Sequence, residues 1–412
     1  MLPQNDGTGM LTETRFGRQS GTRMRPFVIS CLALFCVGRL GYGQTNDHLY
    51  RSWRWSTTPG SARAVGFSGA YVGIADDGGT AFLNPAGIVT LAKSEVSISL
   101  LAAQRGDLGV DHFGPWTGLT AAAGAARLSK KTALACYFTR PRAGRIELSP
   151  AVRLPDGSTD AGYLDATVTD VGATVARRLG ERLSVGVRVT ATHLKLEGLH
   201  RRSNAGDRLE LETGSAAGDT RVTASLGLLY EAGSAGGLRL GLVVQPGASY
   251  TVERTASRPS LGGIDQGSLY ELRAPGVMTI GAAFRINRYV QLSSQLDYVR
   301  YSEIEAFVRP GGATSGRYAM SNGLEPRFGV EASLPLGRAS LQLRTGAYGQ
   351  APGSFVYSGP DANEAAAFRG SNRRVLGAAG ASLVLAGGLT MDVGGTIGGD
   401  RSELAAAARF RF

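Results

Sequence analysis

Two adjacent carboxylates and four histidines are the side chains of this sequence that could do chemistry. Asp76 and Asp77 follow one another inside a stretch rich in Gly and Ala. Paired carboxylates could bind a cation or act as acid and base, but a calcium loop supplies several oxygens at fixed spacing, and this stretch supplies two adjacent residues. We therefore predict a salt-bridged turn whose partners are arginines such as Arg188 or Arg344, and no metal site.

The four histidines, His48, His112, His193 and His200, do not have the spacing of a zinc site. No local motif near His193 marks a serine nucleophile. The expected role of His193 and His200 is that of loop residues that face water. We therefore predict that the chain is not an enzyme and needs no cofactor.

Charge indicates which partners the chain could have. Arg201, Arg202 and Arg208 fall in a polar segment that is predicted to be an outer loop, where they could bind lipopolysaccharide phosphates or remain solvated. The net charge of +11 is compatible with anionic lipid head groups. No compact basic cluster with interleaved aromatic residues indicates nucleic-acid binding, so we expect lipid and no nucleic acid.

An export signal is predicted near the start of the sequence. After Arg25, an apolar core runs over residues 27–38, and the small residues Gly41 and Gly43 follow, which is the pattern of a secretory signal peptide. An apolar core of about 12 residues is too short to cross a hydrocarbon layer about 30 Å thick. We expect cleavage after Gly43, with residues 1–23 as an upstream extension.

Apolar and polar residues alternate with period two along much of the remaining sequence, which is typical of strands with one apolar face. About 14 such segments follow one another, joined alternately by tight turns and by long connections, for example at 141–164, 197–219 and 254–274. This plan predicts an all-β fold, a transmembrane antiparallel β-barrel that closes because an open edge would leave backbone groups unpaired in lipid. The polar positions expected to face the lumen are Arg188, Gln291, Gln295, Asp297, Arg327, Glu331, Arg344 and Asp392.

The C-terminal segment "SELAAAARFRF" alternates in the same way and ends in Phe410 and Phe412. A last strand that ends in an aromatic residue resembles the signal read by the barrel-assembly machinery. With the export signal, it predicts a location in the bacterial outer membrane.

The stretch that contains the two carboxylates precedes the first predicted strand. A barrel of this width cannot fill its lumen with its own side chains, so we predict a division into residues 1–43 (extension and signal peptide), 44–93 (periplasmic segment and plug) and 94–412 (barrel). Small residues let the plug backbone pack closely against a wall. The residues expected to form the plug motif are Gly66, Gly69, Ala70, Asp76, Asp77, Asn84, Pro85, Ala86 and Gly87.

The plug sequence "SARAVGFSGAYVGIADDGGTAFLNPAGI" resembles the N-terminal signature of the FadL-type transporters of hydrophobic compounds and of the related PorV/PorQ barrels, and residues 276–305 resemble a late FadL-type hairpin. The resemblance implies a 14-stranded barrel with an N-terminal hatch, in which Asn84, Pro85 and Ala86 match the hatch motif. It also implies that hydrophobic substrates bind near the extracellular loops, pass the hatch and leave sideways through a wall opening.

These features predict passive transport of hydrophobic or amphipathic small molecules, such as long-chain fatty acids, through a hatch-gated barrel. The alternative is a PorV/PorQ-like barrel that binds secreted cargo proteins during secretion and surface attachment, and the polar segment 197–219 favours this alternative. A closed barrel without traffic is the third hypothesis. The expected partners are outer-membrane lipid and lipopolysaccharide, hydrophobic small molecules, the barrel-assembly machinery and, under the alternative, secreted cargo.

Overall fold

A computed structural model describes residues 60–105, 112–113, 116–232, 237–259, 263–264, 267–303, 318–370, 372–398 and 401–412. The chain divides into two units, residues 1–41 and residues 42–412, and the fold below is that of the second unit. The predicted extension, signal peptide and cleavage site lie outside the described residues, as do residues 44–59 of the predicted plug segment. Among the described residues, no helix has the length and apolar character needed to cross a membrane.

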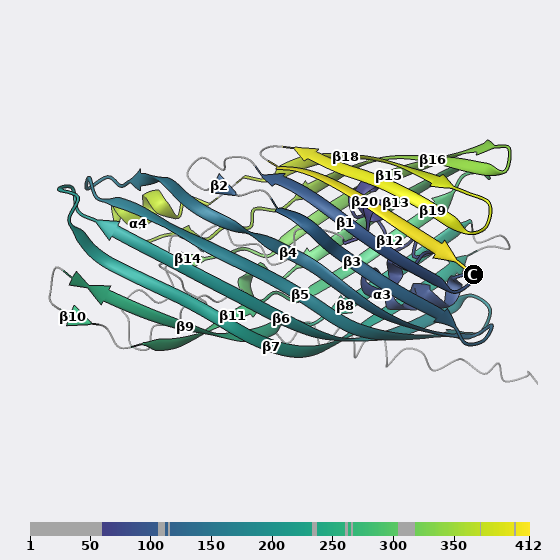
Figure 1. Cartoon of the computed structure of the whole chain (residues 1–412), viewed down its shortest axis with the longest axis horizontal. Helices are drawn as coiled ribbons and strands as arrows, with labels where there is room; N and C mark the ends of the chain where they lie inside the picture. Colours follow the sequence, from purple (N-terminus) through teal and green to yellow (C-terminus); the bar gives the residue numbers. More distant parts are fainter. Residues whose placement is uncertain are drawn as a thin grey trace, which may run out of the picture. The chain divides into compact units, whose positions relative to one another are not determined.

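Fourteen antiparallel strands form a closed barrel, which confirms the predicted fold (Figure 1). The ring closes because the last strand pairs with the first, from Glu95 opposite Arg411 to Arg105 opposite Arg401. In chain order the barrel strands are β1 (Glu95–Arg105), β3 (Trp116–Arg127), β4 (Thr132–Arg153), β5 (Thr159–Leu179), β6 (Leu183–Ser203), β7 (Leu209–Ala232), β8 (Leu238–Gln245), β12 (Val277–Arg285), β13 (Val290–Val299), β15 (Gly323–Leu336), β16 (Ala339–Gln350), β18 (Arg374–Val384), β19 (Leu389–Gly398) and β20 (Arg401–Arg411).

Shorter elements add to the barrel at the end opposite its tight turns. Strand β2 (His112–Phe113) pairs with β4, and β9 (Ala248–Arg258) pairs with β7, β10 (Gly263–Ile264) and β11 (Ser268–Ala274). The remaining small elements are η4 (Tyr301–Glu303), the two-stranded sheet of β14 (Tyr318–Ala319) and β17 (Val356–Tyr357), and α4 (Ala362–Ala367).

Three predicted long loops are wrong, because most of their residues belong to strands. The turn between β4 and β5 is closed at Leu154–Ser158, and the turn between β6 and β7 at Asn204–Arg208. In the third loop, residues 254–258 belong to β9 and residues 268–274 form β11. These segments lie beyond the lipid, where the outward face of a strand meets water. The outward positions are polar or charged there, so the segments appear polar in sequence.

The lipid-facing surface is apolar, as the alternation predicts. On β5, for example, Val171, Val175 and Leu179 are all exposed and point outward, while Thr174 between them is buried. Such a surface requires hydrocarbon around it, since a soluble protein rarely exposes a continuous apolar band. The barrel is therefore an outer-membrane protein.

The plug, defined here as residues 60–93, lies inside the barrel near the end that carries the tight turns. It consists of α2 (Ala62–Gly66), α3 (Thr80–Leu83) and η2 (Pro85–Thr90), joined by turns (Figure 1). Helix α2 packs against β18, β19 and β20, and η2 packs against β5, β6 and β7. The plug thus spans the lumen from one wall to the other.

Candidate functional site

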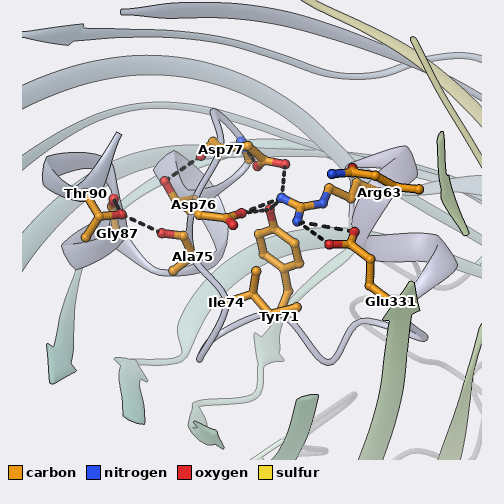
Figure 2. A network of polar contacts seen from close by, with 12 residues as sticks. Arg63, Tyr71, Ile74, Ala75, Asp76, Asp77, Gly87, Thr90 and Glu331 are labelled. Carbon is orange, nitrogen blue, oxygen red and sulfur yellow. Dashed lines mark hydrogen bonds and ion pairs between the residues drawn. The ribbon is translucent and has the colours of Figure 1, made fainter. Parts of the chain in front are cut away.

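Arg63 is the centre of an ionic network that holds the plug together (Figure 2). The Arg63 guanidinium binds Asp76 and donates to Tyr71 Oη at 2.9 Å and to Asp77 Oδ2 at 3.3 Å. Its other terminal nitrogen donates to the Glu331 carboxylate on β15, at 3.3 and 3.4 Å. One buried cation therefore connects the two halves of the plug with the barrel wall.

The network continues around the wall through two further arginines. Arg409 on β20 donates to Asp77 Oδ2 at 3.2 Å and to Asp392 Oδ2 on β19 at 2.7 Å. Arg344 on β16 donates to Glu331 Oε2 at 2.6 Å and lies 3.6 Å from Asp392 Oδ1. Three arginines and four carboxylates thus share one buried cluster, in which each carboxylate has a cationic partner.

The turn predicted for Asp76 and Asp77 is present, but the partners Arg188 and Arg344 proposed for it are wrong. The two carboxylates pair with Arg63 and Arg409 instead. Burial alone would raise the pKa of Asp76, but the Arg63 guanidinium outweighs it and holds that pKa below its usual range. Asp76 therefore remains ionised and bound at neutral pH.

The hatch motif is fixed by the side chain of Asn84, which is fully buried. Its amide nitrogen donates to Val72 O at 2.8 Å and to Leu228 O of β7 at 3.3 Å, and its oxygen caps η2 by accepting from Ala86 N at 3.1 Å. Pro85 then suits the first helical position, where no backbone donor is needed. Asn84 thus ties both arms of the plug to one strand of the wall.

The end of η2 returns to the acidic turn through Thr90, whose hydroxyl donates to Ala75 O at 3.0 Å and to Gly87 O at 2.8 Å (Figure 2). Gly87 has no room for a side chain, because a Cβ there would lie 2.6 Å from that of Ala75. The hatch motif and the carboxylate pair are therefore one packed unit.

A second attachment of the plug lies on β13 and β15. Gln295 Oε1 accepts from Tyr71 N at 2.9 Å and from Val72 N at 3.0 Å, and Arg327 donates to Ser68 O at 2.9 Å and to Asp297 Oδ2 at 2.6 Å. Ala70 O accepts from Ser293 Oγ at 2.5 Å. These polar side chains satisfy plug backbone groups that no secondary structure pairs.

Gly69 is required where Arg327 crosses the plug. Its φ of +80° is in the left-handed region, and a Cβ would lie 2.6 Å from Arg327 Nη1. Gly66, by contrast, is needed for close approach, because its Cβ would lie 3.2 Å from Gly380 Cα on β18.

The remaining lumen-facing residues have different surroundings. Arg188 binds Phe82 O of the plug and donates to Ser225 Oγ at 3.1 Å and to Gln245 Oε1 at 2.9 Å. Gln291 lies on the same face of β13 as Gln295, opposite Glu331 in the ladder, and makes no plug contact among the described residues.

Sequence reasoning missed a band of wall glycines against which the plug backbone packs. A Cβ at Gly394 would overlap Ala62 O, and one at Gly241 would overlap Val72 O. The signal that could have found the band is the recurrence of Gly on the polar face of many strands. Its members that touch the plug are Gly186, Gly227, Gly241, Gly281, Gly329, Gly346, Gly380 and Gly394.

The lumen beyond the plug holds an apolar cluster, here called the outer cluster. From Gly186, which touches the plug, to Leu194 in this cluster, β6 extends outward for about 27 Å along the tilted strand, at about 3.4 Å per residue. The outer cluster therefore lies well outward of the plug. Its buried members are Leu148, Leu164, Ala166, Val168, Leu194, Leu196, Tyr250, Val252, Leu272, Ala274, Val299, Tyr301, Tyr318, Met320, Ala351, Phe355, Tyr357 and Phe368.

Aromatic rings cover the outer cluster at the barrel mouth. Tyr318 packs against Tyr357 with ring centroids 4.9 Å apart and against Phe368 at 5.1 Å. Helix α4 precedes Phe368, and its Asn363 donates to Asp156 Oδ2 in the β4–β5 turn at 2.7 Å. This contact joins the segment between β16 and β18 to the opposite rim.

Replacing Asn363 with alanine is expected to loosen this cover. Asn363 also accepts from Asp156 N at 3.3 Å, and both bonds are exposed, so their loss costs at the low end of about 0.5–1.5 kcal/mol each. Limited proteolysis should cleave residues 351–370 faster in Asn363→Ala. Asn287→Ala, which removes a turn cap at the other end of the barrel, should leave that rate unchanged.

The contact should also depend on pH in a defined direction. Hydrogen bonds from Ser158 hold the pKa of Asp156 below its usual value, and Asn363 adds to the effect. A carboxyl whose folded pKa is lowered stabilises the folded state above its ordinary pKa of about 3.9, and loses that effect as pH falls through the lowered value. Proteolysis of residues 351–370 should therefore accelerate only below about pH 4.

The histidine and arginine predictions have mixed outcomes. His193 is exposed, as predicted, and it lies on β6 rather than in a loop. His200 is buried, with its Nε2 3.4 Å from Asp160 Oδ1, so the prediction that it faces water is wrong. His48 lies outside the described residues. Arg202 also binds Asp160, at 2.8 Å, while Arg201 is exposed and bound to Glu212 at 2.6 Å. Arg208 is exposed in the β6–β7 turn.

Phe410 and Phe412 lie at the tight-turn end of β20. Both are exposed, and their rings stack with centroids 6.1 Å apart. The final backbone amide donates to Ser94 O at 3.1 Å, so the C-terminus completes the seam with β1. Recognition of these rings by the barrel-assembly machinery stays a prediction.

Three solved structures are similar to this chain in fold. The toluene transporter TbuX of Ralstonia pickettii has a TM-score of 0.60 at 16% identity, over 85% of this chain and 97% of TbuX. The monoaromatic hydrocarbon channel CymD has a TM-score of 0.60 at 13% identity, over 85% and 97% of the two chains. The toluene transporter TodX of P. putida has a TM-score of 0.55 at 10% identity, over 82% and 94%. No family model and no curated protein matches the sequence.

Proposed function

We propose that this barrel, whose fold is that of the FadL-type transporters, moves small hydrophobic or amphipathic molecules passively across the outer membrane. The observation that carries the proposal is the outer cluster, a packed group of buried apolar and aromatic side chains placed outward of a plug that is anchored by ion pairs. Apolar molecules leave water for such a lining, since burial of apolar surface is favourable by about 25 cal/mol per Å².

The surroundings of His200 and Arg202, two basic side chains near the outer cluster, support uncharged compounds over fatty acids. Near the outer cluster, Arg202 donates to Asp160 at 2.8 Å and His200 lies 3.4 Å from the same carboxylate, so these two basic side chains already have an acidic partner. A fatty-acid carboxylate would need a cation of its own, because a buried unpaired charge is costly. The named substrates of TbuX and TodX, toluene, and of CymD, monoaromatic hydrocarbons, belong to the uncharged class that we propose for this chain.

A sideways exit is proposed where β3 and β4 separate. Their ladder ends at Ala121 opposite Thr139, and outward of it β4 next pairs with β2, at Ile146 and Glu147. The β4–β5 register shifts between Thr139 and Arg142, around Pro141, which has no backbone donor for a ladder. A compound that passes the outer cluster could leave the lumen through this interruption of the wall.

Placing a charge in the outer cluster tests the proposal. Leu194 on β6 is fully buried and faces inward, while its neighbour Lys195 is exposed and faces outward. We expect Leu194→Asp to weaken binding of a fluorescent uncharged aromatic probe by about tenfold or more, because the buried carboxylate disfavours an apolar ligand. Titration of the purified barrel in detergent measures this affinity.

Lys195→Asp is the matched control, since it introduces the same side chain one position away on the outer face. Equal affinities for wild type, Leu194→Asp and Lys195→Asp would contradict the proposal. A barrel that binds no probe but copurifies with one secreted protein in stoichiometric amount would support the PorV/PorQ-like alternative instead.

A further inference from the structure

A second interruption of the wall lies between β7 and the long strand formed by β8 and β9. Strand β7 pairs with β9 at residues 212–216 and with β8 at residues 226–232. Residues 217–225 between these blocks, all of them described, have no ladder partner on that side. The opposite strand is broken at Pro246 and Gly247, and the next strand at Pro275 and Gly276, so the ladder cannot continue across this height.

Two side chains of β7 replace the missing ladder. Asp219 Oδ2 accepts from the backbone amide of Thr251 at 2.8 Å, and Arg221 Nε donates to the backbone carbonyl of Ser249 at 2.6 Å. Asp219 and Arg221 also pair with each other at 2.7 Å. The wall is therefore closed here by one ion pair, whose members can change rotamer without unzipping a strand.

A hollow of about 710 Å³ occupies this interruption. Its outer rim carries Val222 and Leu269, each 69% exposed. Its lining combines apolar and polar groups from β7, β9 and β11, with Arg221, Ala248, Tyr250 and Glu271 among them. The volume is in the range of small-molecule sites.

Tyr250 separates the hollow from the lumen. It is 1% exposed, and it belongs both to the lining of the hollow and to the outer cluster. Its side chain hydrogen-bonds Thr192 on β6, so it extends behind β7 on the lumen side. Movement of this one ring would connect the hollow with the outer cluster.

The hollow opens at the outer edge of the lipid-facing band. Val222 lies opposite Ala191, which lies opposite Val171, so these residues form one register row across three strands. Inward of it, Leu226 and Tyr230 continue the exposed apolar row on β7, while outward of it Thr220 is polar. Amphipathic rings prefer this boundary between hydrocarbon and head groups.

We propose that this hollow is a binding site for a small uncharged apolar molecule and a lateral portal between the outer-leaflet boundary and the outer cluster. Asp219 and Arg221 close it on the wall, and Tyr250 closes it on the lumen side. The inference rests on the proposed function, because the portal serves the same class of compound. It adds a second route, on the side of the barrel formed by β7 to β9.

Photolabelling in outer-membrane vesicles tests the portal. The probe is a benzene that carries an alkyl diazirine, with excess toluene as competitor, and labelled peptides are mapped by mass spectrometry. We expect toluene-sensitive labelling both in the outer cluster and at residues 217–225 or 247–251. Ser249→Trp, which puts a ring into the hollow from the face of β9 that points away from the outer cluster, should lower labelling at the hollow about tenfold. The matched control Val171→Trp puts the same ring on the outward face of β5 and should leave labelling of the hollow unchanged.

The outcomes separate the two claims. Toluene-sensitive labelling of the outer cluster without labelling of the hollow overturns the portal and leaves the proposed function standing. Equal labelling of the hollow in Ser249→Trp and Val171→Trp also overturns the portal. Absence of toluene-sensitive labelling at both places overturns the proposed function and the portal together. Heat-dependent mobility in gel electrophoresis shows that each variant has folded as a barrel.

Discussion

Replacing Arg63 with methionine is expected to release the plug and turn the barrel into an ion-conducting pore. The substitution keeps much of the side-chain volume. It leaves the Asp76 carboxylate without its cationic partner, and it removes one of the cationic partners of Asp77 and of Glu331. Removing one member of a buried ion pair costs about 3–5 kcal/mol, so the fraction of barrels with a displaced plug should rise by about a hundredfold to a few thousandfold. Single-channel conductance in planar bilayers measures that fraction directly.

The control for Arg63→Met is Arg201→Met, because Arg201 also binds a carboxylate but is exposed on the outer part of β6. An exposed pair contributes about 0–1 kcal/mol, so this variant should stay as closed as the wild type. If Arg63→Met conducted no more than Arg201→Met, the ion-pair network would not be what holds the plug.

Gly186→Ala is expected to displace the hatch motif, although it adds a single methyl group. A Cβ at Gly186 would overlap the backbone of Pro85 and Ala86, and backbone cannot move aside as a side-chain tip can. Overpacking of this kind costs typically about 1–3 kcal/mol, and more where nothing can shift. We expect a lower unfolding temperature and amide exchange in residues 84–90 that is at least about tenfold faster.

Gly124→Ala provides the comparison, because a Cβ at Gly124 on β3 meets nothing within 4 Å. The same substitution in the same kind of strand should therefore leave stability and exchange near wild type, or slightly improve them by restricting the unfolded chain. Similar destabilisation by the two substitutions would show that glycine matters for strand conformation and not for the contact with the plug.

Much of the fold could be predicted because lipid imposes a simple rule on strands. Val185, Val187 and Val189 alternate with Ser184 and Arg188, and this row predicts an outward apolar face on β6. The same rule failed farther along that strand. Beyond the lipid, Lys195 and Glu197 point outward, and Leu194 and Leu196 point into the lumen. The apolar face is therefore the inward one, and the charged outward positions made the segment resemble a polar loop.

The candidate site could be predicted only where its parts are close in sequence. Asp76, Asp77 and the segment 84–87 form one local motif, and the turn they build was expected from it. Arg63 carries no pattern of its own, because its partner Glu331 is 268 residues away in the chain. The wall glycines and the outer cluster are also assembled from many strands, and their register is set by the closed ladder rather than by local sequence.

Uptake of an uncharged aromatic probe into cells tests the central claim most directly. The cells should have an outer leaflet of lipopolysaccharide, because a simple phospholipid bilayer admits such molecules without a protein. We expect cells with the wild-type barrel to take up the probe several times faster than cells with Leu194→Asp, at equal amounts of folded barrel and with no gain in permeability to sugars. Equal uptake by cells with wild type, with Leu194→Asp and with no barrel would contradict transport through the outer cluster.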